Sequence, residues 1–422
     1  ETVIGVDSDA PPEAEGLEQA GVEVSLGVDG TRLLDRARTL VKSPGVPQDA
    51  PVVRAARDHG MPVTGELELA WRLLPNEFCA VTGTNGKTTT TELVGHLYRT
   101  AGQPVAVAGN VGTPLASLVG AVDPDATIVC ECSSFQLEDT EHFAPECGVF
   151  INLAPDHLDR HGTLEDYLEA KLRIFRNQGN DDATVYNGRT KELRDRDLGG
   201  CGRLIRFCPA EGTDAADPDC AVSMRDGVIF AGDEPLIRAD ELQLLGRHNV
   251  ENAMAAAAAA LASGLSMDAV AEGLRSFEGV RHRLERVREL DGVLYVNDSK
   301  ATNVASAFAG IESFERGVRM IAGGRPKGES FASLNDPIRE RCVAVYLIGE
   351  AAERMASELS PAAAAGVAIT DCFTLERAVE AAAADAKPGE VVLLSPACAS
   401  FDAFEDFEAR GDRFRELAEG LG

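Results

Sequence analysis

Short apolar runs alternate with longer amphipathic stretches along nearly the whole chain, a pattern typical of strands that are followed by helices. The apolar runs predict strands at Thr2–Val6, Phe78–Thr82, Thr127–Cys132, Val149–Leu153, Val293–Asn297, Val318–Ala322, Val343–Ile348 and Val391–Leu394. The clearest amphipathic stretches predict helices at Thr88–Thr100 and Leu375–Ala386. Because strands that alternate with helices build βαβ units, we expect an α/β fold with mostly parallel sheets.

Residues Asp181–Glu241 depart from this alternation. They are polar and rich in turn formers, with only short alternating pieces, which predicts an excursion of small antiparallel strands. The alanine-rich tract Ala255–Ala262 then predicts a closely packed helix. Weak boundaries near Glu66 and near Glu278–Gly279 divide the chain into three expected domains, at residues 1–66, 67–279 and 280–422.

The three expected domains differ in kind. The first is expected to be Rossmann-like but incomplete, because the chain opens on a strand that ends at Asp7 and no strand with a glycine-rich turn precedes it. The second is expected to hold a mostly parallel sheet of the P-loop ATPase type, with the antiparallel excursion attached to it. The third is again expected to be Rossmann-like.

Composition narrows the class of protein. The 422 residues carry a net charge of −29, and so acidic a surface repels nucleic acid and anionic membranes, which we therefore do not expect as partners. No apolar run reaches the roughly 18 residues that a bilayer-spanning helix needs, and the first residues do not resemble a signal peptide. The ten cysteines form no Cys-x-x-Cys pair, which predicts buried thiols in a reducing cytoplasm and no disulfide framework.

The strongest local signal is a strand, a glycine loop and a helix start between Phe78 and Thr90. Gly83 and Gly86 allow backbone N–H groups to turn toward a phosphate. Lys87 can reach the β- and γ-phosphates, and the Thr88 hydroxyl can bind Mg²⁺. Although the spacing is two residues tighter than the common form of this loop, the sequence predicts a nucleoside triphosphate site.

Acidic and histidine side chains follow the next strands. Glu131 closes the apolar run Thr127–Cys132, and ligands of open parallel sheets bind at the carboxyl ends of strands. The following strand leads into a loop that contains Asp156, His157, Asp159 and His161. Such groups suit a Mg²⁺ ion beside phosphates, while an acid that merely ends a strand and a solvated polar loop are the alternatives.

Lys171 lies beside the apolar stripe of a predicted helix. Thr163 is a plausible N-cap, and the stripe consists of Leu164, Leu168, Leu172 and Phe175. Partial burial would lower the pKa of the lysine and make its neutral amine available for covalent chemistry. The alternative is a lysine whose ammonium group extends into solvent.

These motifs occur in a characteristic order. They are Gly83–Thr88, Glu131–Leu137, Asp156–Arg160, Ala170–Phe175, Gly246–Asn252, His282–Glu285, Asn297–Asn303 and Ser395–Asp402. In this order they resemble the Mur ligase family over essentially the whole chain, and the last two resemble its D-glutamate-adding branch. The resemblance implies a monomeric cytoplasmic enzyme of peptidoglycan precursor synthesis that joins D-glutamate to UDP-N-acetylmuramoyl-L-alanine and uses ATP.

The resemblance also implies roles for residues of the nucleotide and metal site. ATP would contact Gly83, Thr84, Asn85, Gly86, Lys87, Thr88, Thr89, Asn252, Arg283 and Asp298. Two Mg²⁺ ions are expected, with Thr88, Glu131 and His157 as ligands and with a carbamylated Lys171 that supports the second ion. The catalytic set would be Lys87, Glu131, His157 and Lys171.

For the other substrates the resemblance implies two further sets of contacts. The muramoyl-alanine part of the nucleotide sugar would contact Asn110, Ser133 and Gln136, and its uridine end would contact Ser8 and Ser43. D-Glutamate would meet Lys300, Thr302, Lys327, Ser400, Phe401 and Phe407, whose cations and hydroxyls suit a dicarboxylate. His248 and His282 are expected to be structural.

The expected reaction has two steps. The carboxylate of the muramoyl-alanine attacks the γ-phosphate and forms an acyl phosphate and ADP, and the amine of D-glutamate then displaces phosphate. Because Lys87 and Asp298 fall in different predicted domains, we expect the nucleotide to lie between them and domain closure to exclude water. The alternatives are another amide ligase of the superfamily, such as a folylpolyglutamate synthase, and a nucleotide-binding regulatory protein without ligase activity.

Overall fold

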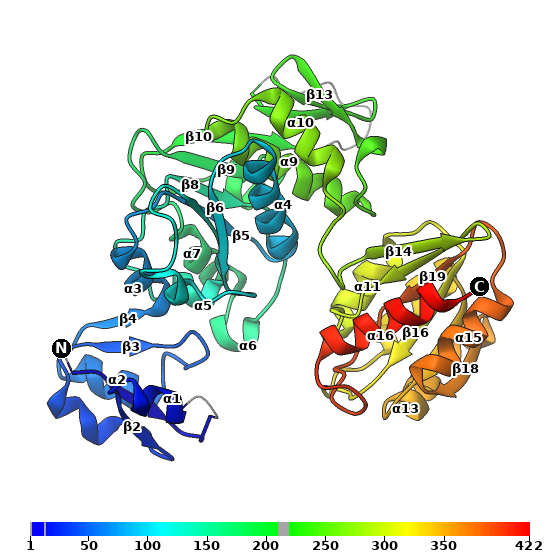
Figure 1. Cartoon of the computed structure of the whole chain (residues 1–422), viewed down its shortest axis with the longest axis horizontal. Coiled ribbons are helices and arrows are strands. Elements are labelled where there is room, and N and C mark those ends of the chain that lie inside the picture. Colours follow the sequence, from blue (N-terminus) through cyan, green and yellow to red (C-terminus); the bar gives the residue numbers. More distant parts are fainter. Residues whose placement is uncertain (1, 12–13, 210–218) are drawn as a thin grey trace. The chain divides into compact units, whose positions relative to one another are not determined.

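The computed structural model describes residues 2–11, 14–209 and 219–422. Contacts divide the chain into unit 1, with Glu1–Met224, Ala231–Glu234 and Met254–Val270, and unit 2, with Arg225–Phe230, Pro235–Ala253 and Ala271–Gly422. Figure 1 shows helices and strands mixed along the chain in both units, which confirms the α/β class. The domain boundaries near residues 66 and 279 stay predictions. Within the described ranges, no helix is long and apolar enough to cross a membrane.

Unit 1 begins with βαβ units. β1 (Ile4–Asp7), α1 (Ala14–Gln19) and β2 (Glu23–Leu26) form the first, and β3 (Leu40–Lys42), α2 (Pro51–Asp58) and β4 (Val63–Gly65) form the second. The strands of each unit pair in parallel. Parallel neighbours require a crossover connection, which the intervening helix supplies.

A large, mostly parallel sheet follows, with strand order β13-β12-β11-β10-β9-β8-β5-β7-β6. Its strands are β5 (Phe78–Thr82), β6 (Val105–Gly109), β7 (Thr127–Glu131), β8 (Cys147–Phe150), β9 (Ala183–Asn187), β10 (Arg203–Cys208), β11 (Val222–Arg225), β12 (Val228–Ala231) and β13 (Glu234–Arg238). The helices between residues 66 and 276 are α3 (Glu66–Leu73), α4 (Lys87–Thr100), α5 (Ser134–Leu137), α6 (Leu158–His161), α7 (Leu164–Leu172), α8 (Lys191–Arg194), α9 (Arg247–Ala262) and α10 (Met267–Ser276). β5 is buried along its whole length and pairs in parallel with β7 and β8, so its carboxyl end opens between two neighbours.

The predicted excursion at residues 181–241 is wrong in part. β9 pairs in parallel with β8, β10 with β9, and β11 with β10, so these strands extend the parallel sheet. β9 is fully buried, and the turn-rich loops around it hide this burial in the sequence. β11 and β12 are connected by only two residues, Asp226 and Gly227, with φ values of 48° and 75°. Left-handed φ values at both residues of a two-residue connection are typical of an antiparallel hairpin, so the predicted antiparallel geometry begins after β11.

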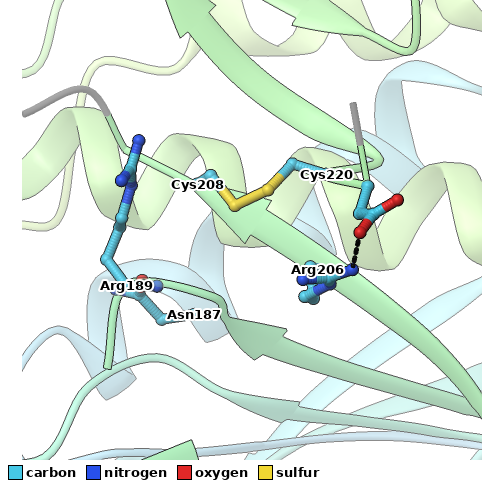
Figure 2. The surroundings of a disulfide bond; sticks show 6 residues. Asn187, Arg189, Arg206, Cys208 and Cys220 are labelled. Carbon is cyan, nitrogen blue, oxygen red and sulfur yellow. Dashed lines mark hydrogen bonds and ion pairs between the residues drawn. A yellow bond between two sulfur atoms is a disulfide. The ribbon is translucent and has the colours of Figure 1, made fainter. Parts of the chain in front are cut away.

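The expectation of free thiols throughout is also wrong, because Cys208 and Cys220 form a disulfide (Figure 2). Cys208 ends β10 opposite Ser223, whereas Cys220 lies before the first residue of β11, and the two cysteine Cα atoms are 5.9 Å apart. The contact depends on the path of the chain before β11, which Cys spacing alone does not reveal. The other cysteines are free thiols, and all of them except Cys201 are buried as predicted.

Unit 2 contains a second sheet with strand order β14-β15-β19-β16-β17-β18. Its strands are β14 (Glu285–Leu290), β15 (Val293–Asn297), β16 (Val318–Gly323), β17 (Cys342–Ile348), β18 (Ala368–Phe373) and β19 (Val391–Leu394). Its later helices are α11 (Val304–Glu312), α12 (Asn335–Arg341), α13 (Ala352–Glu358), α14 (Ser360–Ala364), α15 (Leu375–Asp385) and α16 (Phe407–Gly420). β14 is antiparallel to β15, and the other strand pairs are parallel.

Alternate residues of this second sheet belong to separate hydrophobic cores. Met320 and Leu393 pack with α11 and α12, whereas Ile321 and Leu394 pack with α15 and α16. Helices therefore cover both faces of the sheet, which explains why its central strands are continuous apolar runs. The loops at the carboxyl ends of β15, β16 and β19 remain available to carry functional side chains.

Candidate active site

The predicted phosphate loop lies between β5 and α4. Gly86 has a φ of 80°, and a Cβ on Gly83 would lie 3.2 Å from Cβ of Ile151, so both positions favour glycine. Lys87 begins α4, and its Nζ donates to the carbonyl oxygens of Gly83 at 3.1 Å and Thr84 at 2.9 Å. The lysine ammonium is thus held over the loop at the positive end of a helix.

The segment that follows β8 fixes the conformation of this loop. The N–H of Asn85 donates to Oδ1 of Asn152 at 2.9 Å, and Nδ2 of Asn152 donates back to the Asn85 carbonyl at 3.2 Å. The Thr84 hydroxyl donates to the Ala154 carbonyl and accepts from the Ala154 N–H. Asn152 and Ala154 form hydrogen bonds with the phosphate loop, and β8 ends before them at Phe150, earlier than the predicted strand Val149–Leu153.

Lys171 is buried on α7 and reaches the same loop. Only 1% of its surface is exposed, and its Nζ donates to the Gly83 carbonyl at 2.7 Å and lies 4.5 Å from the centre of the Tyr167 ring. Burial lowers the pKa of Lys171 well below its usual value, and the positive charge of Lys87 lowers it further. The predicted burial is confirmed, and the environment favours the neutral amine.

Glu131 and its neighbours line the adjacent strand ends. Glu131 is 3% exposed at the end of β7, and Nδ2 of Asn110 donates to its Oε1 at 3.0 Å. Ser133 is the N-cap of α5, and its hydroxyl and N–H both donate to Oε1 of Gln136. Of the residues predicted to contact the muramoyl-alanine part, Asn110 thus contacts Glu131, while Ser133 and Gln136 bond to each other at the start of α5, just after β7.

The loop after β8 brings aromatic and histidine rings together. His157 has a φ of 51°, is exposed, and lies 3.5 Å from the carboxylate of Asp156. Its ring centre is 4.9 Å from that of Phe135, which also stacks with His161 at 5.3 Å. Phe135 lies between Ser133 and Gln136 in the chain, so this stack joins the His157 loop to α5.

The donor set suits magnesium bound in the manner of nucleotide sites. Thr88, Glu131 and His157 offer a hydroxyl, a carboxylate and an imidazole, and Mg²⁺ commonly takes one or two carboxylates together with substrate phosphates and waters. In the part of the chain that the structure describes, no three His, Cys, Asp or Glu side chains form a group that could hold a metal by themselves. The residues therefore fit an ion that is bound together with the nucleotide.

The residues predicted to receive D-glutamate lie in unit 2. Nζ of Lys327 donates to the Thr302 hydroxyl at 3.1 Å, and Nζ of Lys300 lies 5.6 Å from the centre of the Phe407 ring. Ser400 is buried in the loop after β19. Phe401, in contrast, is 62% exposed, and its contact with an amino acid stays a prediction.

A buried arginine, which the sequence analysis missed, organises these loops. Arg410 on α16 is 1% exposed and donates to the hydroxyl and carbonyl of Ser299 and to the carbonyls of Cys398 and Ala399. Burial lowers its pKa to about 10, which leaves the guanidinium charged at neutral pH. Arg410 lies near the start of a helix that is rich in charged residues, and the pattern Phe-x-x-Arg offers no signal for its burial, because arginine is usually exposed.

Two of the later residues predicted to contact ATP, Asn252 and Asp298, are buried. Nδ2 of Asn252 donates to Oδ1 of Asn249 within the start of α9. Asp298 follows β15, and it accepts from the Ser395 hydroxyl at 2.8 Å and from the Leu284 N–H at 3.3 Å. Burial raises the pKa of Asp298 to about 7, although the charge of Arg283 opposes this shift.

The remaining predicted residues differ in exposure, from exposed serines to a buried histidine. Ser8 and Ser43 are exposed in loops after β1 and β3. His282 is buried against Asn297, whose Nδ2 lies 3.0 Å from its Nδ1, as a structural residue would be. Asp159 belongs to α6, but its side chain lies outside the described part of the chain.

Comparison with known proteins identifies the family. Residues 81–260 match the Mur ligase middle domain, and residues 282–398 match the Mur ligase glutamate ligase domain. The UDP-N-acetylmuramoylalanine--D-glutamate ligase of Pelotomaculum thermopropionicum is 43% identical over 97% of this chain and 89% of the relative. The ligase of the same name from Salinibacter ruber is 43% identical over 98% of this chain and 92% of the relative.

Solved structures agree at the level of the fold. The UDP-N-acetylmuramate-alanine ligase of Thermotoga maritima has a TM-score of 0.62 and 20% identity, and the match covers 99% of this chain and 93% of that one. A MurF structure from Acinetobacter baumannii has a TM-score of 0.61 and 18% identity, and covers 82% of this chain and 78% of that one. With the full-length relatives and both domain matches in view, the chain belongs to the Mur ligase family, with the UDP-N-acetylmuramoylalanine--D-glutamate ligases.

Proposed function

We propose that this chain joins D-glutamate to UDP-N-acetylmuramoyl-L-alanine, with ATP as the energy source, in the cytoplasmic synthesis of peptidoglycan precursors. The observation that carries the proposal is the buried Lys171, whose Nζ lies 2.7 Å from the Gly83 carbonyl in the phosphate loop. The full-length relatives bear the name of this reaction at 43% identity, which supports the choice of substrates.

Lys171 would work as a carbamate. Its neutral amine would attack CO₂, so that an N–C bond forms while one C=O π bond of CO₂ breaks and its electron pair passes to oxygen. The amine nitrogen would release a proton, and the side chain would then end in a carbamate anion. Glu131, His157 and Thr88 would hold Mg²⁺ with this carboxylate, and the ions would neutralise the phosphate charge during transfer.

Lys87 would hold the phosphates of ATP in the loop of Gly83 and Gly86. Asn110, Ser133 and Gln136 would orient the alanyl carboxylate for attack on the γ-phosphate. The products of this step would be ADP and an acyl phosphate.

Unit 2 would bind D-glutamate, the incoming amino acid. Lys300, Lys327 and the Thr302 hydroxyl would bind the two carboxylates of D-glutamate, because paired cations and donors suit a dicarboxylate. The amine, once deprotonated, would attack the acyl carbon, an amide bond would form and phosphate would leave. The protein's contribution would be placement and charge neutralisation.

The test is release of phosphate by the purified full chain. We expect release to require ATP, Mg²⁺, UDP-N-acetylmuramoyl-L-alanine and D-glutamate together, and the product to contain the new amide. Release with a folate acceptor in place of the UDP-sugar would instead support a folylpolyglutamate synthase. Binding of ATP without turnover in the complete mixture would support a regulatory nucleotide-binding protein, and sedimentation would test the expected monomer.

A further inference from the structure

Arg160 joins three segments of unit 1 that are far apart in the sequence. Its guanidinium donates to the carbonyls of Pro44 at 3.1 Å and Val46 at 3.4 Å, in the loop after β3. It also donates to Oε1 of Glu138 at 3.0 Å and lies 4.1 Å from the centre of the Phe135 ring. Arg160 itself belongs to α6, in the loop that carries His157.

The loop after β3 is tied to the same place by a buried ion pair. Nζ of Lys42 lies 2.7 Å from the carboxylate of Asp139, with side chains 1% and 3% exposed, and it donates to the Val46 carbonyl at 2.8 Å. Nε2 of Gln48 donates to Glu138 at 2.9 Å and to Asp139 at 2.7 Å. Lys42 and Arg160 therefore both donate to the Val46 carbonyl, and Arg160 also donates to that of Pro44. Movement of residues 43–46 is thus coupled to movement of Arg160.

Arg160 also contacts the part of the proposed site that contains α5 and His157. Phe135, which lies under the guanidinium, sits in α5 between Ser133 and Gln136, and its ring also contacts His157 and His161. The hydroxyl of Ser134 bonds to Nε2 of His161 at 2.9 Å. The position of Arg160 is thus coupled both to α5 and to the His157 loop.

We propose that Arg160 is a positioning residue, which transmits the seating of a nucleotide sugar on residues 43–46 to α5 and the His157 loop. The inference rests on the proposed function, through the predicted contact of Ser43 with the uridine end of the substrate. Binding energy from that remote end would then be used to align the alanyl carboxylate, and would raise kcat as well as affinity. Arginine suits this task because its planar fork binds several acceptors while its face stacks on a ring.

The test compares Arg160→Lys and Glu138→Gln with a control, Arg176→Lys. Arg176 lines the same polar cavity as Arg160 but is exposed, and among the described residues its side chain has no hydrogen bond or ion pair. Each full-length variant is assayed for phosphate release with UDP-N-acetylmuramoyl-L-alanine and, separately, with N-acetylmuramoyl-L-alanine that lacks UDP. Thermal unfolding shows whether each variant keeps its fold.

We expect Arg160→Lys to lower kcat for the complete substrate by about 10- to 100-fold, a typical consequence of slight misplacement. Its rate with the truncated substrate should change less than about 3-fold, because that substrate cannot use the remote contact. Glu138→Gln, which removes the negative charge beside the guanidinium and keeps the shape and an acceptor oxygen, should give a smaller loss of the same kind, and Arg176→Lys should match the wild type.

Other outcomes would overturn the inference. A rise in KM with unchanged kcat would assign Arg160 to binding alone, and equal losses with both substrates would make it a structural residue. Should Arg160→Lys unfold, wild-type behaviour of Glu138→Gln with the complete substrate would count against the coupling. Failure of the proposed function is separate, because in that case the wild type itself releases no phosphate with the complete substrate.

Discussion

Unit 1 contains two lysines that are buried to nearly the same degree in very different surroundings. Lys42 is 2% exposed and lies 2.7 Å from the carboxylate of Asp139. Lys171 is 1% exposed, and its hydrogen bonds go to the Gly83 carbonyl and the Thr82 hydroxyl. No carboxylate within the described ranges forms an ion pair with Lys171.

The difference shows that the presence or absence of a carboxylate partner, more than the degree of burial, determines whether a buried lysine stabilises the fold or is reactive. The Asp139 carboxylate compensates the charge of Lys42, so that the pair can hold the chain after β3 in place. For Lys171, burial and the neighbouring Lys87 both lower the pKa, and the neutral amine is the reactive form. The first lysine is therefore expected to serve stability and the second chemistry.

The largest effect should come from Lys171→Ala. We expect this substitution to abolish ligation, with bicarbonate unable to restore it, because alanine has no amine to carbamylate. Phosphate release in the complete reaction mixture measures the loss, and Lys191→Ala, at an exposed lysine of α8, is the control. Full activity of Lys171→Ala would contradict the carbamate role and remove the contrast with Lys42.

In contrast to Lys171→Ala, which should abolish activity, Lys42→Met should mainly lower the stability of the fold. It leaves the buried Asp139 carboxylate without its cation, which typically costs about 3–5 kcal/mol in the free energy of unfolding. Urea denaturation at neutral pH measures this cost, and the double variant Lys42→Met/Asp139→Leu should recover much of it. A cost well below about 1 kcal/mol would show that water or a rearranged neighbour replaces the ion pair.

Carbamylation can be observed directly at Lys171. Because burial lowers the pKa of its amine, a neutral fraction should exist at a pH where exposed lysines are protonated. With ¹³C-bicarbonate at about pH 7.5, we expect an NMR carbamate signal in the wild type that is absent from Lys171→Ala and that declines in acid as the amine protonates. A signal that survives Lys171→Ala would assign the carbamate to another amine.

Asp298 extends the comparison to a buried acid. Burial raises its pKa from 3.8 to about 7, so the folded chain binds this proton more tightly than the unfolded chain. The resulting stability is complete below about pH 4 and is lost as the pH rises through about 7. Asp298→Asn cannot ionise, so chemical denaturation should show its stability, relative to wild type, rising between pH 4 and 8 by at most about 1.4 kcal/mol per pH unit; a constant difference would contradict the raised pKa.

Sequence patterns predicted the features that depend on neighbouring residues. The apolar runs at Phe78–Thr82 and Val391–Leu394 became the buried strands β5 and β19 with the predicted bounds, because a parallel sheet buries both faces of such strands. The phosphate loop and the burial of Lys171 were also predictable, since both follow from short-range spacing. Carbamylation and the substrate contacts stay predictions.

Features that depend on contacts between distant segments were missed. The parallel pairing of β9, β10 and β11 requires knowledge of strand order, and the Cys208–Cys220 disulfide requires knowledge of the path of the chain before β11. Arg160 and Arg410 look like ordinary surface arginines in the sequence, because most of their acceptors are backbone carbonyls contributed by other loops. Backbone carbonyls have no residue signature, so no pattern could have pointed to them.

The hydrogen bonds of the buried Arg410 fix a charge that changes little when the pH inside the cell varies. Burial lowers the pKa of a lysine, as it does for Lys171, so a lysine in this place would lose its charge more readily than arginine, and the electrostatic potential beside Ser299 would then depend more strongly on pH. With a pKa of about 10 and acceptors that never titrate, the guanidinium instead behaves as a permanent charge. Arg410 therefore keeps its positive charge across the physiological pH range, and a pH dependence beside Ser299 has to come from a titrating neighbour such as Asp298.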